Sequence, residues 1–170
     1  VVKFDASLAG LTIENSSLPA LENDVVIENI AESPVLLDFA VLETTAALTL
    51  KNMTLNQVIL NGANASLNGS GNVLTGEEAI SLVEYEGTIS AGMWSDVFTV
   101  TSDSAYIGLN GAIGSATLEN LTSILPGGYK ITGSCYIADN DTLTLGEGAC
   151  LEMTYPWASL TIHGTLKVDN

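Results

Sequence analysis

The acidic side chains are the residues of this sequence whose types and spacing could do chemistry. Asp139-Asn140-Asp141 places oxygen ligands in one turn, and Glu77-Glu78 forms a second dense pair. Glu84 and Glu86 would lie on one face of a strand. Carboxylate and carbonyl oxygens are the ligands of Ca²⁺, which takes roughly six to eight of them. We therefore expect no cofactor other than calcium, with Asp139 and Asp141 as candidate ligands, and the alternative is a solvated acidic face.

Other catalytic or metal chemistry has little basis in the residue pattern. Two carboxylates about 5 to 9 Å apart could hydrolyse a glycosidic bond, but 20 acidic residues make such pairs common by accident. His163 has no Cys or His at the spacing of a zinc site, so we expect it on a surface turn. The sequence therefore predicts a protein that is not an enzyme.

Two cysteines, Cys135 and Cys150, are separated by 15 positions. We expect a disulfide between them, within one chain or between two chains. Closing a loop of this length would stabilise the fold by about 3 kcal/mol. Two free buried thiols are the alternative, because sequence spacing does not decide between these states.

The N-x-S/T triplets point to an extracellular surface, because they are acceptors for N-linked glycans. They are more frequent than we expect by chance. The alternative is that Asn and Thr recur in turns and strands and create the pattern by composition. We expect only some of the positions to carry glycans. The candidates are Asn15, Asn52, Asn64, Asn68, Asn120 and Asn140.

Composition and charge exclude several classes of partner. The chain has 170 residues, 46 % of them apolar, and its 20 acidic and 4 basic residues give a net charge of −16. Nucleic acids, anionic membranes and polyanionic sugars are bound by clusters of Lys and Arg, which the sequence lacks. No run of about 18 uncharged apolar residues could insert into a membrane. The chain begins without Met or a signal-type segment, so we expect a processed form or a fragment.

Short alternating runs cover most of the chain and predict an all-β protein. Each run places apolar residues on one strand face and polar residues on the other, and Gly, Asn, Asp or Ser ends it. Ser33-Pro34 could begin a helix toward Leu42, but apolar residues on the other helical faces favour two buried strands there. The runs are residues 11–15, 25–29, 48–52, 58–61, 96–100, 106–109, 116–120, 129–132, 142–145 and 159–162.

The spacing of the runs favours a parallel β-helix, or β-solenoid. Runs that end in Asn stop at residues 15, 29, 52 and 120, and the gap of 23 between two of them is close to one coil. Residues 1–170 would then form a single domain of roughly seven coils. Asn at a corner tolerates left-handed backbone and could bond the Asn of the next coil. The alternative is a β-sandwich, in which Asn-Gly pairs are hairpin turns.

The C-terminal part of the chain carries a resemblance to a known group. Residues 128–133 read GYKITG, residues 142–148 read TLTLGEG and residues 159–166 read SLTIHGTL. This succession resembles a phrase of secreted right-handed parallel β-helix proteins, including sheath-like and envelope proteins of methanogenic archaea. Gly146-Glu147-Gly148 stands where the phrase has a Pro-Gly turn. The resemblance implies a β-solenoid at a cell surface.

The enzymes of this broad group provide a test of activity. Its lyases use an Arg or Lys base beside calcium, whereas this chain has no Arg and four scattered lysines. Its hydrolases combine several Asp residues, a basic residue and a His-Gly element. His163-Gly164 is present without those companions. The resemblance therefore does not extend to catalysis.

We expect an extracellular structural subunit that assembles with itself into a sheath, filament or surface layer by pairing of strand edges. Its partners would be its own copies and glycans, with no nucleic acid and no membrane insertion. A second hypothesis is a monomeric adhesin or carbohydrate-binding module. Trp94 or the Tyr155–Trp157 cluster would then be the sugar platform, unless these rings fill the core. A third is a fragment of a larger β-helix lyase.

Overall fold

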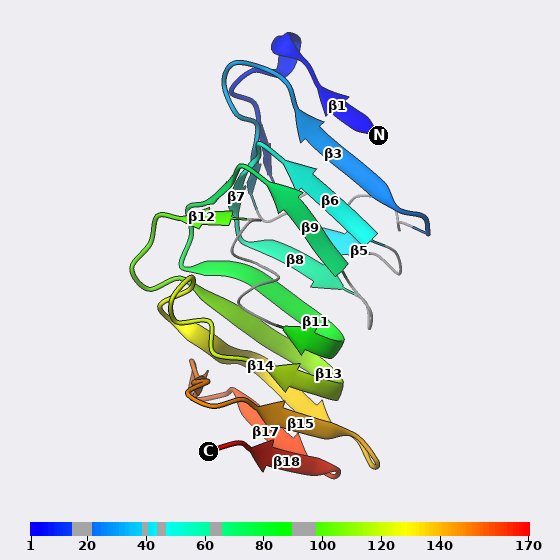
Figure 1. Ribbon diagram of the computed structural model, residues 1–170, viewed down its shortest axis with the longest axis vertical. Helices are drawn as coiled ribbons and strands as arrows, with labels where there is room; N and C mark the ends of the chain where they lie inside the picture. Colours follow the sequence, from blue (N-terminus) through cyan, green and yellow to red (C-terminus); the bar gives the residue numbers. More distant parts are fainter. Residues whose placement is uncertain (15–21, 39–40, 44–46, 62–65, 90–97) are drawn as a thin grey trace.

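The protein is a stack of parallel β-coils, seen in a computed structural model that describes residues 1–14, 22–38, 41–43, 47–61, 66–89 and 98–170. The strands follow one another along the longest axis, with the N-terminus at one end and the C-terminus at the other (Figure 1). All pairings between described strands are parallel. The predicted β-solenoid is confirmed, with about six turns where roughly seven were expected. The β-sandwich alternative is wrong, because it requires antiparallel strands.

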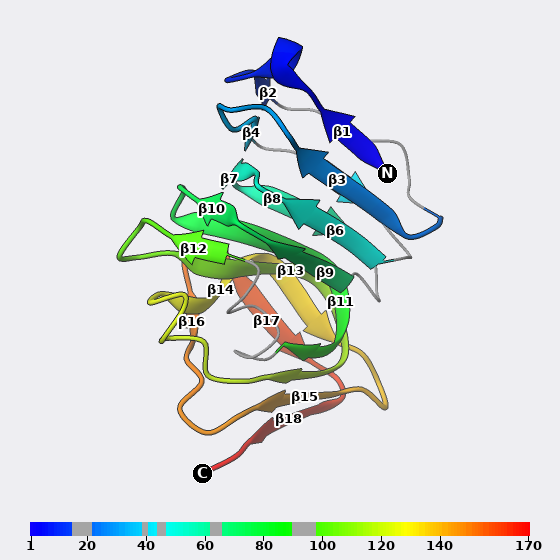
Figure 2. The ribbon, with the colours of Figure 1, turned by 45° about the horizontal axis from the view of Figure 1, so that its top comes forward.

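Three sheets form the walls of the solenoid (Figures 1 and 2). Sheet A contains, in spatial order, β1 (Val2–Phe4), β3 (Val25–Asn29), β6 (Ala47–Lys51) and β9 (Ser66–Ser70). Sheet B contains β12 (Phe98–Val100), β10 (Asn72–Leu74), β7 (Thr54–Asn56), β4 (Leu36–Asp38) and β2 (Thr12–Glu14). Sheet C contains β16 (Leu151–Met153), β14 (Gly128–Ile137), β13 (Tyr106–Leu118), β11 (Glu78–Ile89), β8 (Val58–Asn61) and β5 (Val41–Glu43).

Three further strands extend sheet C at the C-terminal end. They are β15 (Thr142–Leu145), β17 (Ser159–Ile162) and β18 (Thr165–Val168), and the short 3-10 helix η1 (Ala6–Leu8) lies at the other end. Strand β15 pairs with β13 and β18, while β17 pairs with β14. The segment in which a helix was the alternative forms strands β4 and β5. Two-residue alternation therefore located the strands well, since each predicted run meets a strand within the described ranges.

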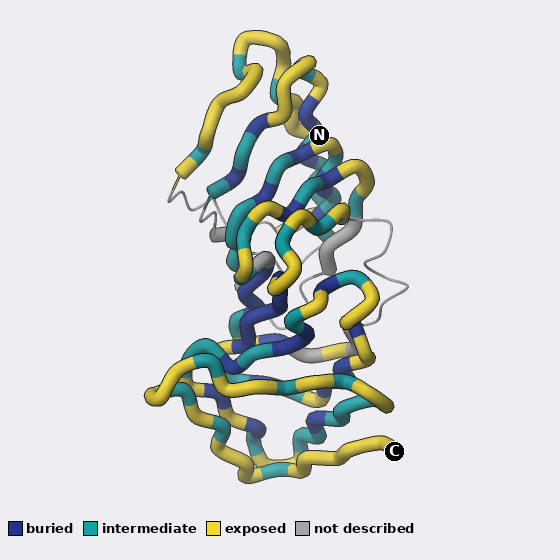
Figure 3. The backbone as a smooth tube through the Cα atoms, turned by 90° about the vertical axis from the view of Figure 1, so that its left-hand side faces the viewer, coloured by how far each residue is buried: buried dark blue, intermediate teal, exposed yellow. Residues whose placement is uncertain are grey.

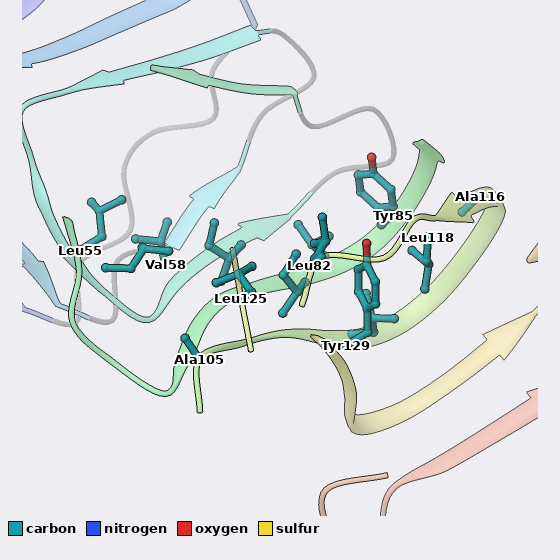
Figure 4. Packing of buried hydrophobic residues seen from close by; sticks show 14 of the residues in the cluster. Leu55, Val58, Leu82, Tyr85, Ala105, Ala116, Leu118, Leu125 and Tyr129 are labelled. Atoms are coloured by element: carbon teal, nitrogen blue, oxygen red, sulfur yellow. The ribbon is translucent and has the colours of Figure 1, made fainter. Parts of the chain in front are cut away.

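The core consists of columns of apolar side chains, one from each successive coil. In sheet B, Leu37 pairs with Leu55 and Leu55 pairs with Leu74, and these three side chains are buried. A second column in sheet C contains Ile107 and Tyr129, both fully buried, and Figure 4 shows part of this packing. Because coils are about 4.8 Å apart, each column residue is covered only by the coils directly before and after it.

The coils differ in length, so a single repeat does not describe the chain. Glu28 pairs with Lys51, which places Asn29 and Asn52 at equivalent corners 23 residues apart, as expected. In sheet B, however, Leu36 pairs with Thr54, only 18 residues later. The longer gap to Asn120 is therefore not three equal coils, and the varying loops explain why the coil count was overestimated.

Asparagine side chains hold the corners, though not through the expected Asn–Asn ladder. The buried Asn72 accepts a hydrogen bond from the Met53 N–H (3.0 Å) and donates one to the Leu50 carbonyl (2.8 Å), both in the preceding coil. The Asn29 amide bonds to the main chain of Ala31 in its own corner. The expectation of Asn–Asn contacts is wrong at these corners, because the turning main chain there needs hydrogen-bond partners.

Replacing Asn72 by Leu removes these two hydrogen bonds inside the solenoid. We expect the free energy of unfolding to fall by about 2–4 kcal/mol, because two main-chain groups of a buried corner lose their partners. Chemical denaturation followed by circular dichroism measures the change. Asn170→Leu, at an exposed position, is the matched control and should leave stability unchanged. Equal stability of Asn72→Leu and the unaltered protein would contradict this role.

Candidate functional site

The C-terminal coil, formed by β16, β17 and β18, is an open face of the solenoid. Its inward residues continue the core columns, since Leu166 pairs with Leu143 and Ile162 pairs with Ile137. Leu143 and Ile137 are fully buried, whereas Leu166 is 38 % and Ile162 46 % exposed. The colouring by burial in Figure 3 shows the same contrast between the central coils and the two ends. The column residues at this end therefore lack the apolar cover that they have in the inner coils.

The main chain of the C-terminal coil also faces outward at alternate residues. The N–H groups of Thr165 and Asp169 donate to carbonyls of the preceding coil at 2.9 Å. Because successive residues of a strand direct their N–H and C=O groups to opposite sides, those of Leu166 and Val168 point away from β15. In the described part of the chain, no strand lies on that side of β18. This coil therefore presents the donors and acceptors of a sheet edge.

The N-terminal coil presents a second sheet edge. The Phe4 carbonyl accepts a hydrogen bond from the Ile30 N–H at 2.9 Å, so Phe4 faces β3. By the same alternation, the main chain of Lys3 faces outward. Val2 and Leu11 on this coil are 48 % and 44 % exposed. Since the coils are parallel, the two ends are of opposite kind, and the C-terminal end of one molecule could pair with the N-terminal end of another.

An exposed aromatic pair lies in the turn between β16 and β17. The rings of Tyr155 and Trp157 stack with centroids 4.7 Å apart and planes 3° apart. Trp157 is 69 % exposed. The Ala158 N–H donates to the Tyr155 carbonyl at 2.9 Å, which closes a β-turn with Pro156 at its second position. The predicted Tyr155–Trp157 cluster is thus a surface feature and not part of the core, whereas Trp94 lies outside the described residues.

A charged and aromatic cluster adjoins this pair. The Lys130 ammonium lies 4.6 Å from the centroid of the Tyr106 ring and 3.9 Å from a carboxylate oxygen of Glu152. Burial, followed by the charges of Glu78 and Tyr155, raises the pKa of Tyr106 to about 12. Tyr106 is therefore a neutral phenol at physiological pH, which suits packing better than proton transfer. The cluster connects the outer face of sheet C to the aromatic pair.

The acidic residues are distributed over the surface. No group of three or more His, Cys, Asp and Glu side chains converges within the described ranges. Asp139 is exposed, and Asp141 accepts a hydrogen bond from the Ser115 hydroxyl at 3.0 Å. Asp141 and Glu84 line one hollow of about 260 Å³. The side chain of Glu86 lies outside the described residues, and calcium binding at Asp139 and Asp141 stays a prediction.

Two of the remaining singled-out acids and the histidine have ordinary surroundings. Glu78 accepts hydrogen bonds from the Gln57 amide (3.0 Å), in the preceding coil, and from the Ser81 hydroxyl (2.5 Å). Glu77 is exposed, and His163 is exposed in the bend after β17, as expected. These contacts give each residue a structural role or a solvated position.

The predicted disulfide is wrong within one chain, because both thiols are free. Cys135 is buried on β14, opposite Gly111 in one neighbouring coil and Leu160 in the other. The exposed Cys150 lies beside the start of the same strand, where its carbonyl accepts a hydrogen bond from the Tyr129 N–H. Several residues at roughly 3.3 Å each separate the two positions. A disulfide between chains stays a prediction.

Three of the candidate glycosylation sites lie at exposed corners, namely Asn52, Asn120 and Asn140. Asn15 and Asn64 lie outside the described residues, and so does the side chain of Asn68, which is part of β9. Glycan attachment at all of them stays a prediction. Among the helices of the described ranges, none is long and apolar enough to cross a membrane.

Thiol reactivity tests the free state of the two cysteines. Burial raises the pKa of the Cys135 thiol to about 11, so at about pH 8 the reactive thiolate is scarce there. We expect one thiol to react with a disulfide reagent in the native protein and two after denaturation without reductant. Cys150→Ala should abolish the native reaction, and Cys135→Ala should leave it intact. Absence of reactive thiols in the denatured protein would instead reveal a disulfide.

Comparison with protein-family models, curated proteins and solved structures finds no match for this chain. The parallel coils support the resemblance to β-helix proteins at the level of the fold. The secretion and the sheath or envelope role that the resemblance implies stay predictions.

Proposed function

We propose that this protein is an extracellular structural subunit that assembles end to end, with the C-terminal coil of one copy stacked on the N-terminal coil of the next. The observation that carries the proposal is the open C-terminal face. It combines outward main-chain groups with exposed residues of the core columns, and β1 and β2 offer a matching parallel edge. A second copy would supply the cover that each inner coil already has.

The energetic scale is compatible with association. Four large apolar residues of the C-terminal coil are exposed, and burying such a side chain contributes roughly 1.5–3 kcal/mol. Main-chain hydrogen bonds along the edge add about 1 kcal/mol each. Association costs about 4–15 kcal/mol in lost motion, which the sum can exceed. The residues are Met153, Ile162, Leu166 and Val168.

The two ends differ, so the contact would be heterologous. Heterologous contacts close into rings or continue as open filaments, depending on the rotation between neighbours. A stack of coils with a common axis favours a filament as the first product. Sheaths and layers would then need lateral contacts between filaments. The exposed N-x-S/T sites at Asn52, Asn120 and Asn140 support an extracellular location.

Val168→Pro tests the edge at its exposed side. Proline removes an N–H that faces away from β15 and leaves the inward hydrogen bond of Asp169 in place. We expect the variant to fold but to form at least about tenfold less polymer, because one edge hydrogen bond is lost and the ring obstructs pairing. Sedimentation and negative-stain electron microscopy, with and without millimolar calcium and reductant, measure assembly.

Val168→Ala is the matched control for loss of the valine side chain, since it keeps the N–H group. We expect it to retain more polymer than Val168→Pro. Circular dichroism should show the same strand content in both variants. Dispersed particles of the unaltered protein in every condition would refute end-to-end assembly as the main function.

Ionic strength tests the role of the net charge of −16. Like-charged subunits repel at low ionic strength, and at about 0.15 M salt the screening length falls to roughly 8 Å. We expect light scattering to rise faster as sodium chloride is increased. Assembly that weakens with added salt would indicate that attraction between opposite charges, and not apolar and main-chain contacts, drives it.

A further inference from the structure

We infer that Trp157, held in place by Tyr155, is a binding platform for neutral pyranose sugars. This inference goes beyond self-assembly and does not depend on it. A pyranose has one face of C–H groups that packs against an aromatic ring, while its hydroxyls bond to polar groups at the edge. The site therefore needs an open and fixed ring face with hydrogen-bonding groups nearby.

The turn provides a fixed ring face. The hydrogen bond from Ala158 to Tyr155 closes the turn, and Pro156 fixes its own φ angle within it. Tyr155 covers one face of the Trp157 indole with parallel planes, and Trp157 still remains 69 % exposed. The other indole face is therefore open to solvent. A ring that is ordered before binding costs less conformational entropy when a ligand arrives.

The turn is also fixed to the body of the solenoid. The Thr154 N–H donates to the Ile131 carbonyl at 3.1 Å just before the turn, and Leu160 pairs with Cys135 just after it. On the neighbouring surface, the ring of Tyr106 interacts electrostatically with Tyr155 and carries the Lys130 ammonium. The platform thus rests on residues of two preceding coils.

The surrounding charge selects the class of sugar. Lys130, the cation of this cluster, already contacts both Tyr106 and Glu152, so it offers little to a ligand carboxylate or sulfate. The Glu152 side chain is 58 % exposed and, with the Tyr155 hydroxyl, can accept hydrogen bonds from sugar hydroxyls. The net charge of −16 repels uronic acids and sulfated sugars. A neutral sugar meets all of these conditions.

The platform differs from the edge that would pair in a filament. Tyr155 and Trp157 lie in a turn between β16 and β17, outside the core columns that end in Leu166 and Ile162. The open strand edges face along the solenoid axis, whereas this turn lies beside the strands at the periphery of the coil (Figure 1). A second copy stacked on the end would therefore not need Trp157.

Calorimetric titration of the intact chain with hexasaccharides tests the inference. The neutral probes are hexamers of glucose in β- and α-linkage, of mannose and of N-acetylglucosamine. Hexagalacturonate is the anionic probe and hexaglucosamine the cationic one. We expect at least one neutral probe to bind, and Trp157→Ala to weaken it by about tenfold or more, equivalent to about 1.4 kcal/mol. Tyr136→Ala, which removes another exposed aromatic side chain, is the matched control and should change affinity less than about twofold.

Three results would overturn the inference. One is that none of the four neutral probes binds, and a second is that an ionic probe binds more tightly than all of them. The third is equal affinity of Trp157→Ala and the unaltered protein. Sedimentation of the same samples separates this question from assembly. Loss of polymer in Trp157→Ala without sugar binding by the parent protein would assign Trp157 to the contact between copies.

Discussion

The structure depends on one constraint, namely that a coil is stable only when another coil lies against it. Parallel strands satisfy their main-chain groups on two sides, and the side chains of a column are covered from above and below. Leu55 and Leu74, inside the stack, are completely buried. In such a one-dimensional array, the stability of each unit comes from its neighbours. The ends are therefore the places where free energy is left to be gained by association.

The corners show how the chain turns without losing this stacking. Asn52 and Asn140 adopt positive φ angles of 54° and 73°, a backbone that asparagine tolerates better than most residues. The Asn52 side chain lies against Gly71 of the next coil, where a Cβ atom would come within 2.4 Å of its amide oxygen. Asparagine at one corner thus requires glycine at the next. This relation, and not a hairpin, explains the abundance of both residues.

The sequence predicted local features well and contacts between coils poorly. Alternation of apolar and polar residues is a property of a single strand, so runs such as 142–145 matched a strand in full. The disulfide failed because contacts between coils depend on the length of every intervening loop. These lengths bring Leu160, and not Cys150, opposite Cys135. The stacking of Tyr155 on Trp157 likewise depends on turn geometry, although the two residues are close in sequence.

Scarcity of positive charge links the two proposed properties. Three of the four lysines contact acidic residues, as Lys3 does Glu28 and Lys130 does Glu152. The remaining surface is acidic, which keeps a molecule with two open ends soluble and disfavours anionic sugars. A filament of such subunits would repeat one Trp157 platform about every 30 Å, since about six coils are spaced at roughly 4.8 Å. Weak binding of single sugars would then become strong attachment to a neutral polysaccharide, because each bound platform raises the local concentration of the next.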